Sequence, residues 1–448
     1  MAWEEVIEIV VSASISGTVF KGNQSRLKMK SFKYGTKTIF IIILMSFVYN
    51  FVHGIERRRE QFVTSFGYVA IPIPFSIPGV GSGLGVAGNI NNIPIFGEET
   101  TTDIYALTIP IGDENGSIVG VTDIPLWPKT FIFDILYGEF NKYNQRSYLD
   151  RTMNSKKDDF LNLELDQTQF SGGRLILSFF DRMFELYRFQ YNIKSNISAI
   201  RDNEGNLIYE VNQGFDVQAI TMGSLFDYTD DRTDPLKGVR FNYNYADSPR
   251  RDSDSADFYV QEFNLSGYIP IEKSTIALNW YRAGATVREE GNTDLEALKT
   301  KELAECVANC DTATIQSRAE NQQALNRYGS AGSLGGPTRL RSFAQGRYSG
   351  PQVAFRGVEF RWNFSDKETP IEYYIISDTA INFQLALFYE EGSIADQASD
   401  LWKTKKSSTG LGFRLVTSSQ FVYRIDLASG QEDNEFIFWF DYPWGAVQ

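Results

Sequence analysis

The sequence predicts an all-β protein, an antiparallel transmembrane β-barrel of about sixteen strands. Three observations lead to this fold class. Apolar and polar residues alternate along about a dozen segments after residue 65, the apolar sides are rich in large aromatic residues, and short connections alternate with long polar ones. Because side chains alternate faces along a strand, each segment would present one face to lipid and the other to a water-filled lumen.

Composition fits this class and excludes others. Hydrophobic residues make up 42% of the 448 residues and the mean hydropathy is −0.26, which excludes a helical membrane protein. The net charge of −13 argues against nucleic acid as a partner. The only histidine, His53, precedes the first strand, so His-dependent catalysis is not expected. The sequence therefore predicts no enzyme activity, no cofactor and no metal site.

The N-terminal region resembles an export signal ahead of the barrel. A basic start leads into the apolar run Ile39 to Val52, which is shorter than the ~20 residues that a membrane-spanning helix needs. Retention of this run as an anchor stays open. Arg57 to Arg59 are expected to be solvated or to touch anionic lipid head groups. The chain then divides into four segments: a possible upstream extension (1–28), a signal peptide (29–54), a short periplasmic N-terminus (55–65) and the barrel (66–444).

Sixteen strands follow from the alternation and from the turns between the segments. Turns such as Phe180 to Arg182 are short, whereas the connections on the other side, such as Lys142 to Asp166, are long and charged. A barrel in a bacterial outer membrane places short turns in the periplasm and long loops outside. The strands are predicted near 66–77, 83–93, 102–111, 117–125, 129–145, 167–180, 183–196, 214–228, 238–248, 257–270, 274–288, 352–365, 376–391, 409–417, 420–429 and 434–443.

The insertion 289–350 is the segment that breaks the strand rhythm. Asp294 to Arg327 has helical composition and contains Cys306 and Cys310, which lie one helical turn apart and are the only cysteines. Exported proteins favour disulfides, so these two are predicted to pair. A loop of this length is usually functional or disordered, and the strand count leaves it on the outer face.

Several motifs after the helical stretch carry a resemblance to a known family. They are Leu340-Arg341-Ser342-Phe343 with Gly346-Arg347-Tyr348, then Glu359-Phe360-Arg361, then 388–392 (F-Y-E-E-G), with the earlier turn at 227–238. In this order they resemble the bacterial surface-antigen barrels, the superfamily of BamA, TamA and the two-partner secretion transporters. The sixth outer loop of that family carries a V/L-R-G-F/Y signature. Ser342 and Glu390 stand where the family usually has glycine and aspartate.

The resemblance implies that the long sixth outer loop folds toward the lumen and is anchored there. Alternation along the twelfth and thirteenth strands turns Glu359, Arg361 and Glu390 inward. Two neighbouring carboxylates repel each other unless a cation lies between them. By the resemblance, Arg341 of the loop, followed by Phe343, supplies this cation, and the two departures from the family pattern would loosen the contact. A loop arginine exposed to water stays the alternative.

The closure of the barrel is predicted to be a weak seam. The first strand must pair with the last, but it contains prolines, which have no N–H to donate. By the resemblance, such a seam would act as a lateral gate; prolines lying beyond the paired register are the alternative. The predicted seam residues are Pro72, Pro74, Pro78, Phe436, Phe438 and Phe440.

The resemblance also implies the function, which is to insert, translocate or export a protein or lipid substrate at the outer membrane. The partners would be outer-membrane lipid and that substrate. Residues 55–65 leave no room for the periplasmic POTRA domains of the family, so this would be a member without them. A passive porin-like channel and a plugged structural surface barrel are the alternatives, and a homo-oligomer stays open.

Overall fold

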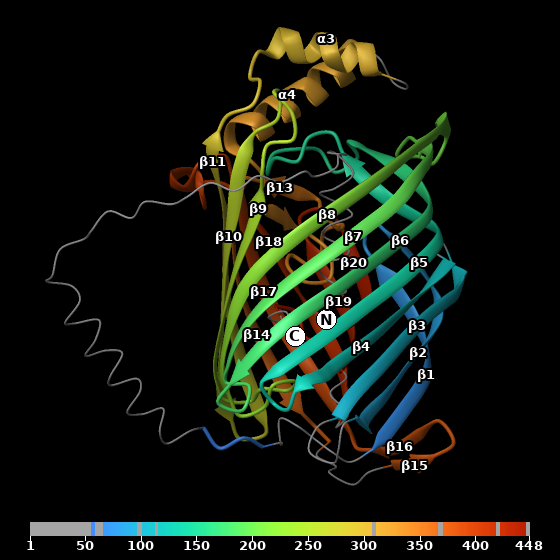
Figure 1. Cartoon of the computed structure of the whole chain (residues 1–448), viewed down its shortest axis with the longest axis vertical. Coiled ribbons are helices and arrows are strands. Elements are labelled where there is room, and N and C mark those ends of the chain that lie inside the picture. The colour runs from blue at the N-terminus through green and yellow to red at the C-terminus, as the bar shows by residue number, and fades with distance from the viewer. Residues whose placement is uncertain are drawn as a thin grey trace, which may run out of the picture.

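Sixteen antiparallel strands close into one barrel, which confirms the predicted fold class (Figure 1). The structure is a computed structural model, and it describes residues 55–58, 66–95, 101–112, 115–306, 311–365, 371–417 and 422–444. The barrel strands are β1 (Gly67–Ile77), β2 (Gly81–Pro94), β3 (Thr101–Gly112), β4 (Asn115–Trp127), β5 (Phe131–Tyr148), β6 (Phe160–Phe179), β7 (Phe184–Arg201), β8 (Leu207–Thr229), β9 (Gly238–Ser248), β10 (Asp257–Ile271), β11 (Ser274–Glu289), β14 (Gln352–Asn363), β17 (Ile381–Ala395), β18 (Lys406–Thr417), β19 (Val422–Gly430) and β20 (Asn434–Phe440).

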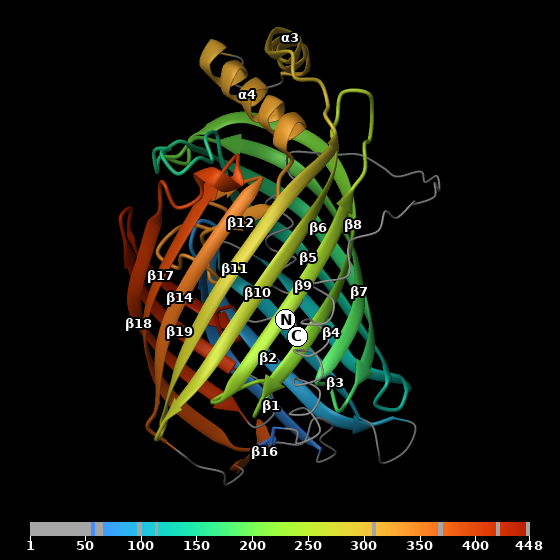
Figure 2. The same cartoon turned by 90° about the vertical axis from the view of Figure 1, so that its left-hand side faces the viewer.

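Short elements lie at both ends of the barrel. At the end with the long loops, β12 (Gly332–Leu334) pairs with β13 (Tyr348–Gly350), and α3 (Leu295–Glu305) and α4 (Thr312–Tyr328) stand above the rim (Figures 1 and 2). At the end with the short turns, β15 (Ile371–Tyr373) pairs with β16 (Ile376–Thr379). A 3-10 turn, Ala398–Asp400, precedes β18. In the described part of the chain, no helix is long and apolar enough to cross a membrane.

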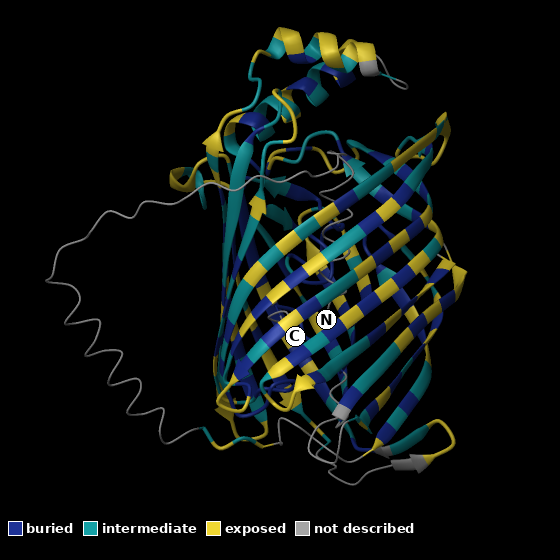
Figure 3. Ribbon diagram, in the orientation of Figure 1, coloured by how far each residue is buried: buried dark blue, intermediate teal, exposed yellow. Residues whose placement is uncertain are grey.

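The two faces of the wall follow the alternation in the sequence. Exposed and buried residues alternate along the strands in Figure 3. In β11, Leu278 and Trp280 are exposed on the outer face, whereas Ala277 and Asn279 are buried on the inner face. The apolar outer side chains are suited to contact with lipid. The closed barrel also satisfies its backbone hydrogen bonds within the wall, so no polar backbone group has to face lipid.

Several strand boundaries differ from the prediction. β5 and β6 continue through much of the predicted loop Lys142 to Asp166, with an unbroken register from Lys142 opposite Asp166 to Tyr148 opposite Phe160. β7 and β8 also continue beyond the predicted bounds 183–196 and 214–228, and β-bulges shift their register there. The predicted strand 376–391 is wrong at its start, since β17 begins at Ile381. The residues before it form β16, which turns away from the wall to pair with β1.

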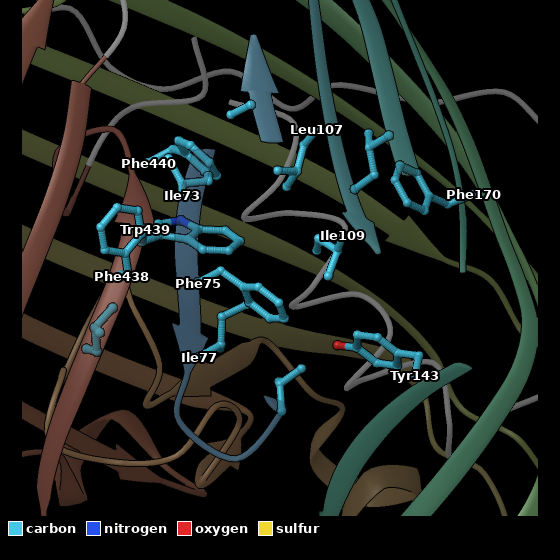
Figure 4. Packing of buried hydrophobic residues seen from close by; sticks show 14 of the residues in the cluster. Ile73, Phe75, Ile77, Leu107, Ile109, Tyr143, Phe170, Phe438, Trp439 and Phe440 are labelled. Atoms are coloured by element: carbon cyan, nitrogen blue, oxygen red, sulfur yellow. The ribbon is translucent and has the colours of Figure 1, made fainter. Parts of the chain in front are cut away.

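The inward face of the first strands is apolar, which differs from the polar lumen expected there. Ile73 and Phe75 of β1 and Leu107 and Ile109 of β3 are buried in one cluster that extends to β20 (Figure 4). Gly83 of β2 makes room between these strands, because a Cβ there would come within 2.5 Å of the Phe75 ring. Charged residues are not absent from this side, since Asp134 of β5 and Arg174 of β6 form a buried ion pair at 2.7 Å.

Candidate functional site

The long loop enters the barrel through the segment 335–347. Gly335, Gly336 and Gly346 have positive φ angles of 110°, 94° and 65°, which glycine adopts without steric cost. These turns lead the chain inward, and Arg341 and Ser342 at the centre of the segment are fully buried. The loop therefore lies against the inner wall formed by β14, β17, β18 and β19.

Arg341 lies among three carboxylates. Its Nε donates to Glu390 Oε1 at 2.8 Å, and its Nη1 lies 3.0 Å from both Glu359 Oε2 and Asp426 Oδ2. The backbone N–H of Arg341 donates to Glu390 Oε2 at 3.0 Å, so one carboxylate holds both main chain and side chain. Burial alone would lower the pKa of Arg341, but the carboxylates of Glu390, Asp426 and Glu359 raise it above its ordinary value.

Three arginines of the wall complete this network. Arg414 of β18 joins two carboxylates, with Nη2 3.1 Å from Glu359 Oε2 and Nη1 2.6 Å from Asp426 Oδ1. Arg424 of β19 donates to Asp426 Oδ2 at 2.6 Å, and Arg361 of β14 donates to Glu359 Oε1 at 2.9 Å. Within the described chain, four guanidinium groups thus face three carboxylates, and no carboxylate of the network is left uncompensated.

Aromatic rings enclose the charged centre. The Cζ atom of Arg341 lies 3.4 Å from the ring centroid of Phe388 and 5.7 Å from that of Trp444. Trp444 also donates from Nε1 to Glu390 Oε1 at 3.0 Å. Phe343 packs edge-on against Tyr348, with 5.4 Å between the ring centroids. Such packing keeps water away from the ion pairs and strengthens their attraction.

The two departures from the family pattern do not lengthen the contact. Glu390 reaches the guanidinium of Arg341 at 2.8 Å, so the predicted loosening is not observed. The N–H of Ser342 donates to Ser408 Oγ at 2.9 Å, and the two hydroxyl oxygens are 2.5 Å apart. Gly430 of β19 provides the space for Ser342, because a Cβ at position 430 would overlap Ser342 Oγ.

Arg347 attaches the loop a second time, nearer the long-loop rim. Its Nη2 and Nε donate to Glu432 Oε1 and Oε2 at 2.8 and 2.9 Å. Its Nη1 donates to Ser155 Oγ at 2.7 Å, and the Tyr348 hydroxyl donates to Glu432 Oε1 at 2.8 Å. The bidentate geometry favours a single orientation of the guanidinium.

β1 and β20 meet at the seam with little backbone pairing. All eleven residues of β1 pair with β2. Among the described residues, only Ser76 pairs with β20, opposite Phe438. Phe436 and Phe440 are in register with β19 instead. Pro78 does not lie in the seam as predicted, because it falls in the turn after β1, where its carbonyl accepts from the N–H of Gln345 at 2.7 Å.

Pro72 and Pro74 account for the sparse pairing. Backbone N–H groups point alternately to the two sides of a strand, and that of Ala70 points to the seam, where it donates to the Ile375 carbonyl at 2.9 Å. Pro72 and Pro74 lie two and four residues after Ala70, so their nitrogens face the same edge of β1. Because proline has no N–H, the seam edge of β1 lacks two backbone hydrogen-bond donors. Apolar side chains of β1 and β20 pack in one cluster at this place (Figure 4).

The N-terminal arginines bind the turn between β8 and β9. Arg58 Nε donates to Asp230 Oδ2 at 2.8 Å, and Arg57 Nη2 donates to the Asp227 carbonyl at 3.0 Å. The side chain of Arg57 is 12% exposed, so the prediction of a solvated terminus is wrong for it. Arg59 lies outside the described residues. The acidic turn attracts these arginines by charge.

The helical part of the insertion consists of two helices. Cys306 is the C-cap of α3 and has an extended backbone, and a new helix begins after Asp311, whose carboxylate accepts from the N–H groups of Ala313 and Thr314. Cys306 therefore ends its helix and does not lie within it. Cys310 lies outside the described residues, and its disulfide with Cys306 stays a prediction.

Sequence reasoning missed several members of the charged network, namely Arg414, Arg424, Asp426 and Trp444. A signal existed for Arg424 and Asp426, because both lie on the polar side of their strand. Which residues of neighbouring strands lie at one height depends on register, and alternation does not specify register.

No protein-family model matches the sequence, and no curated protein matches it. Among solved structures, the chain is similar to BamA from Haemophilus ducreyi lacking POTRA domains 1–3, at 13% identity and a TM-score of 0.44, covering 84% of this chain and 69% of that chain. It is similar to CdiB from Acinetobacter baumannii at 10% identity and a TM-score of 0.44, covering 84% of this chain and 59% of that chain. The outer membrane protein OprD from Pseudomonas aeruginosa gives 9% identity and a TM-score of 0.30, with 86% and 97% covered. The barrel fold itself rests on the strand pairings of this chain.

Proposed function

We propose that this barrel inserts, translocates or exports a protein or lipid substrate at the bacterial outer membrane, through its seam or its lumen. One observation carries the proposal: a lumen occupied by an anchored loop is combined with a seam that, in the described chain, has one register pair between β1 and β20. A passive channel needs a water-filled path through the lumen and has no use for a weakly bonded wall.

The relative strengths of the two closures favour the seam as the part that opens. Removing Arg341 from its buried carboxylates would cost about 3–5 kcal/mol, the range for breaking a buried ion pair. Separating Ser76 from Phe438 would cost about 0.5–1.5 kcal/mol for each backbone hydrogen bond lost.

A disulfide across the seam tests the proposal. Ser76→Cys/Phe438→Cys joins β1 to β20, and the matched control Val69→Cys/Asn89→Cys joins β1 to β2, which stay paired in any opening. Full-length protein in liposomes would be assayed with two probes, namely the folding of a urea-denatured eight-stranded barrel protein and the transbilayer movement of a fluorescent phospholipid. We expect the reduced protein to accelerate at least one process over empty liposomes, and the oxidised seam pair to abolish this gain.

Conductance separates this proposal from the porin-like alternative. In planar bilayers the occupied lumen should give a small, flickering conductance. A large, steady, ohmic conductance that the seam disulfide leaves unchanged would refute the proposal and identify a passive channel. Activity that persists in the oxidised seam pair would likewise rule out use of the seam.

A further inference from the structure

The hairpin β15–β16 covers a part of β1 that β20 does not reach. β16 pairs with the first residues of β1, at Tyr68 with Ser377 and at Val69 with Ile376. Figure 1 places this hairpin at the short-turn end of the barrel, beside β1. The seam is therefore closed by two different strands: β20 from the wall at one end, and β16, which is not a wall strand, at the other.

Contact between the hairpin and β1 cannot spread along the strand. Beyond Ala70, the next two positions of the same parity are Pro72 and Pro74, which have no N–H to offer. The tip of the hairpin stands clear of the barrel, since Tyr374 is 90% exposed and Tyr373 is 64% exposed. A short paired segment next to an unpaired tip can separate without disturbing the other strands.

The place of the hairpin also lowers the cost of separation. A backbone N–H or carbonyl freed within the bilayer stays unsatisfied, whereas one freed at the rim of the barrel can bond to water. The paired residues Tyr68 and Val69 lie at the start of β1, next to the short-turn rim. This end of the seam can therefore open before the apolar part between β1 and β20.

We propose that β15–β16 is a latch on the seam: β16 holds the start of β1 in the closed barrel and detaches as a unit when the seam opens. The proposal rests on the seam opening proposed above and adds the step that controls it. Detachment frees the edge of β1 from Tyr68 to Ala70, and reattachment restores the closed wall.

A disulfide between Val69→Cys and Ile376→Cys locks the latch. Ala70 and Ile375 form a hydrogen-bonded position, so Val69 and Ile376 form a non-hydrogen-bonded pair, in which side chains are closer. Val69→Cys/Asn89→Cys contains the same substitution in β1 and serves as the matched control. Full-length proteins would carry serine at both native cysteines.

Hydrogen–deuterium exchange in liposomes tests the latch without any substrate. We expect the amides of β16 to exchange faster than those of β17, and oxidation of Val69→Cys/Ile376→Cys to slow them, whereas the control pair leaves them unchanged. Exchange of β16 as slow as that of β17, with no effect of the lock, would overturn the inference. So would failure of the latch pair to crosslink under conditions in which the control pair does.

The two liposome probes then separate this inference from the proposed function. Loss of activity in the oxidised latch pair, recovered on reduction and absent from the control, supports the latch. Full activity in the locked latch, together with a block by the Ser76→Cys/Phe438→Cys disulfide, overturns the latch and leaves the proposed function standing. Full activity with both locks overturns both. If neither probe responds to the reduced protein, the proposed function fails for these substrates and the exchange experiment decides on the latch.

Discussion

Replacing Gly430 by alanine should undock the loop from the lumen, although position 430 lies on the wall and carries no charge. A Cβ at this position would overlap Ser342 Oγ and would lie 2.9 Å from Ser342 Cβ and 3.0 Å from the Ser407 carbonyl oxygen. Ser342 would have to move away. Arg341 precedes it and is bonded to Glu390 through both its backbone N–H and its Nε, so the displacement reaches the charged network directly.

The size of the effect follows from two losses. Adding a methyl group to a packed site costs about 1–3 kcal/mol. Loss of the Ser342–Ser408 hydrogen bond adds about 0.5–1.5 kcal/mol. Since each 1.4 kcal/mol is about tenfold in an equilibrium constant, the undocked fraction of the loop should rise by roughly one to three orders of magnitude.

Limited proteolysis measures this fraction. Cleavage within 289–350 reports the open form when opening and closing are fast relative to cleavage. Gly267→Ala on β10 is the matched control, because a Cβ there meets no atom within 4 Å. Ser342→Gly in the Gly430→Ala background should recover most of the protection, since it removes the overlapping atoms and leaves only the Ser407 contact. Wild-type cleavage of Gly430→Ala, or no recovery in the double variant, would refute the reasoning.

Three further changes test other parts of the structure. Arg341→Ala leaves buried carboxylates without a partner and should weaken loop docking by about 3–5 kcal/mol; unchanged protease sensitivity of 289–350 would contradict the anchor. Trp444→Phe keeps the ring over Arg341 but removes the donor to Glu390, so it should weaken docking by about 0.5–1.5 kcal/mol, measured as a smaller rise in cleavage than for Arg341→Ala. Arg58→Gln loses its ion pair with Asp230 and should speed amide exchange in the turn after β8, whereas exchange at the wild-type rate would show that the N-terminal contact contributes nothing.

Local pattern suffices for the strands. The alternation along β9 (Gly238–Ser248) and β11 can be recognised from the residues themselves, because a strand places successive side chains on opposite faces wherever it lies. The same rule predicts from the residues alone that Glu359, Arg361 and Glu390 point inward. The outer end of β6 shows the same alternation, with Leu161, Leu163 and Leu165 buried between polar neighbours, so the sequence contained this strand although the prediction placed a loop there.

The tertiary structure decided which inward residues meet. Asp426 reaches Arg341 only because strand register and loop path bring together residues separated by 85 positions. No local sequence pattern specifies the position of Asp426 along the barrel axis relative to the loop. Likewise, the prolines of β1 are visible in the sequence, but the sequence does not say which edge of β1 lacks the donors. The hydrogen bond from Ala70 to the Ile375 carbonyl shows that it is the edge at the seam. The sequence by itself therefore determined the barrel, its faces and the candidate anchor. Long-range register decided the charged network, the sparse seam and the hairpin that covers it, because contacts between distant segments depend on the whole sheet and not on neighbouring residues.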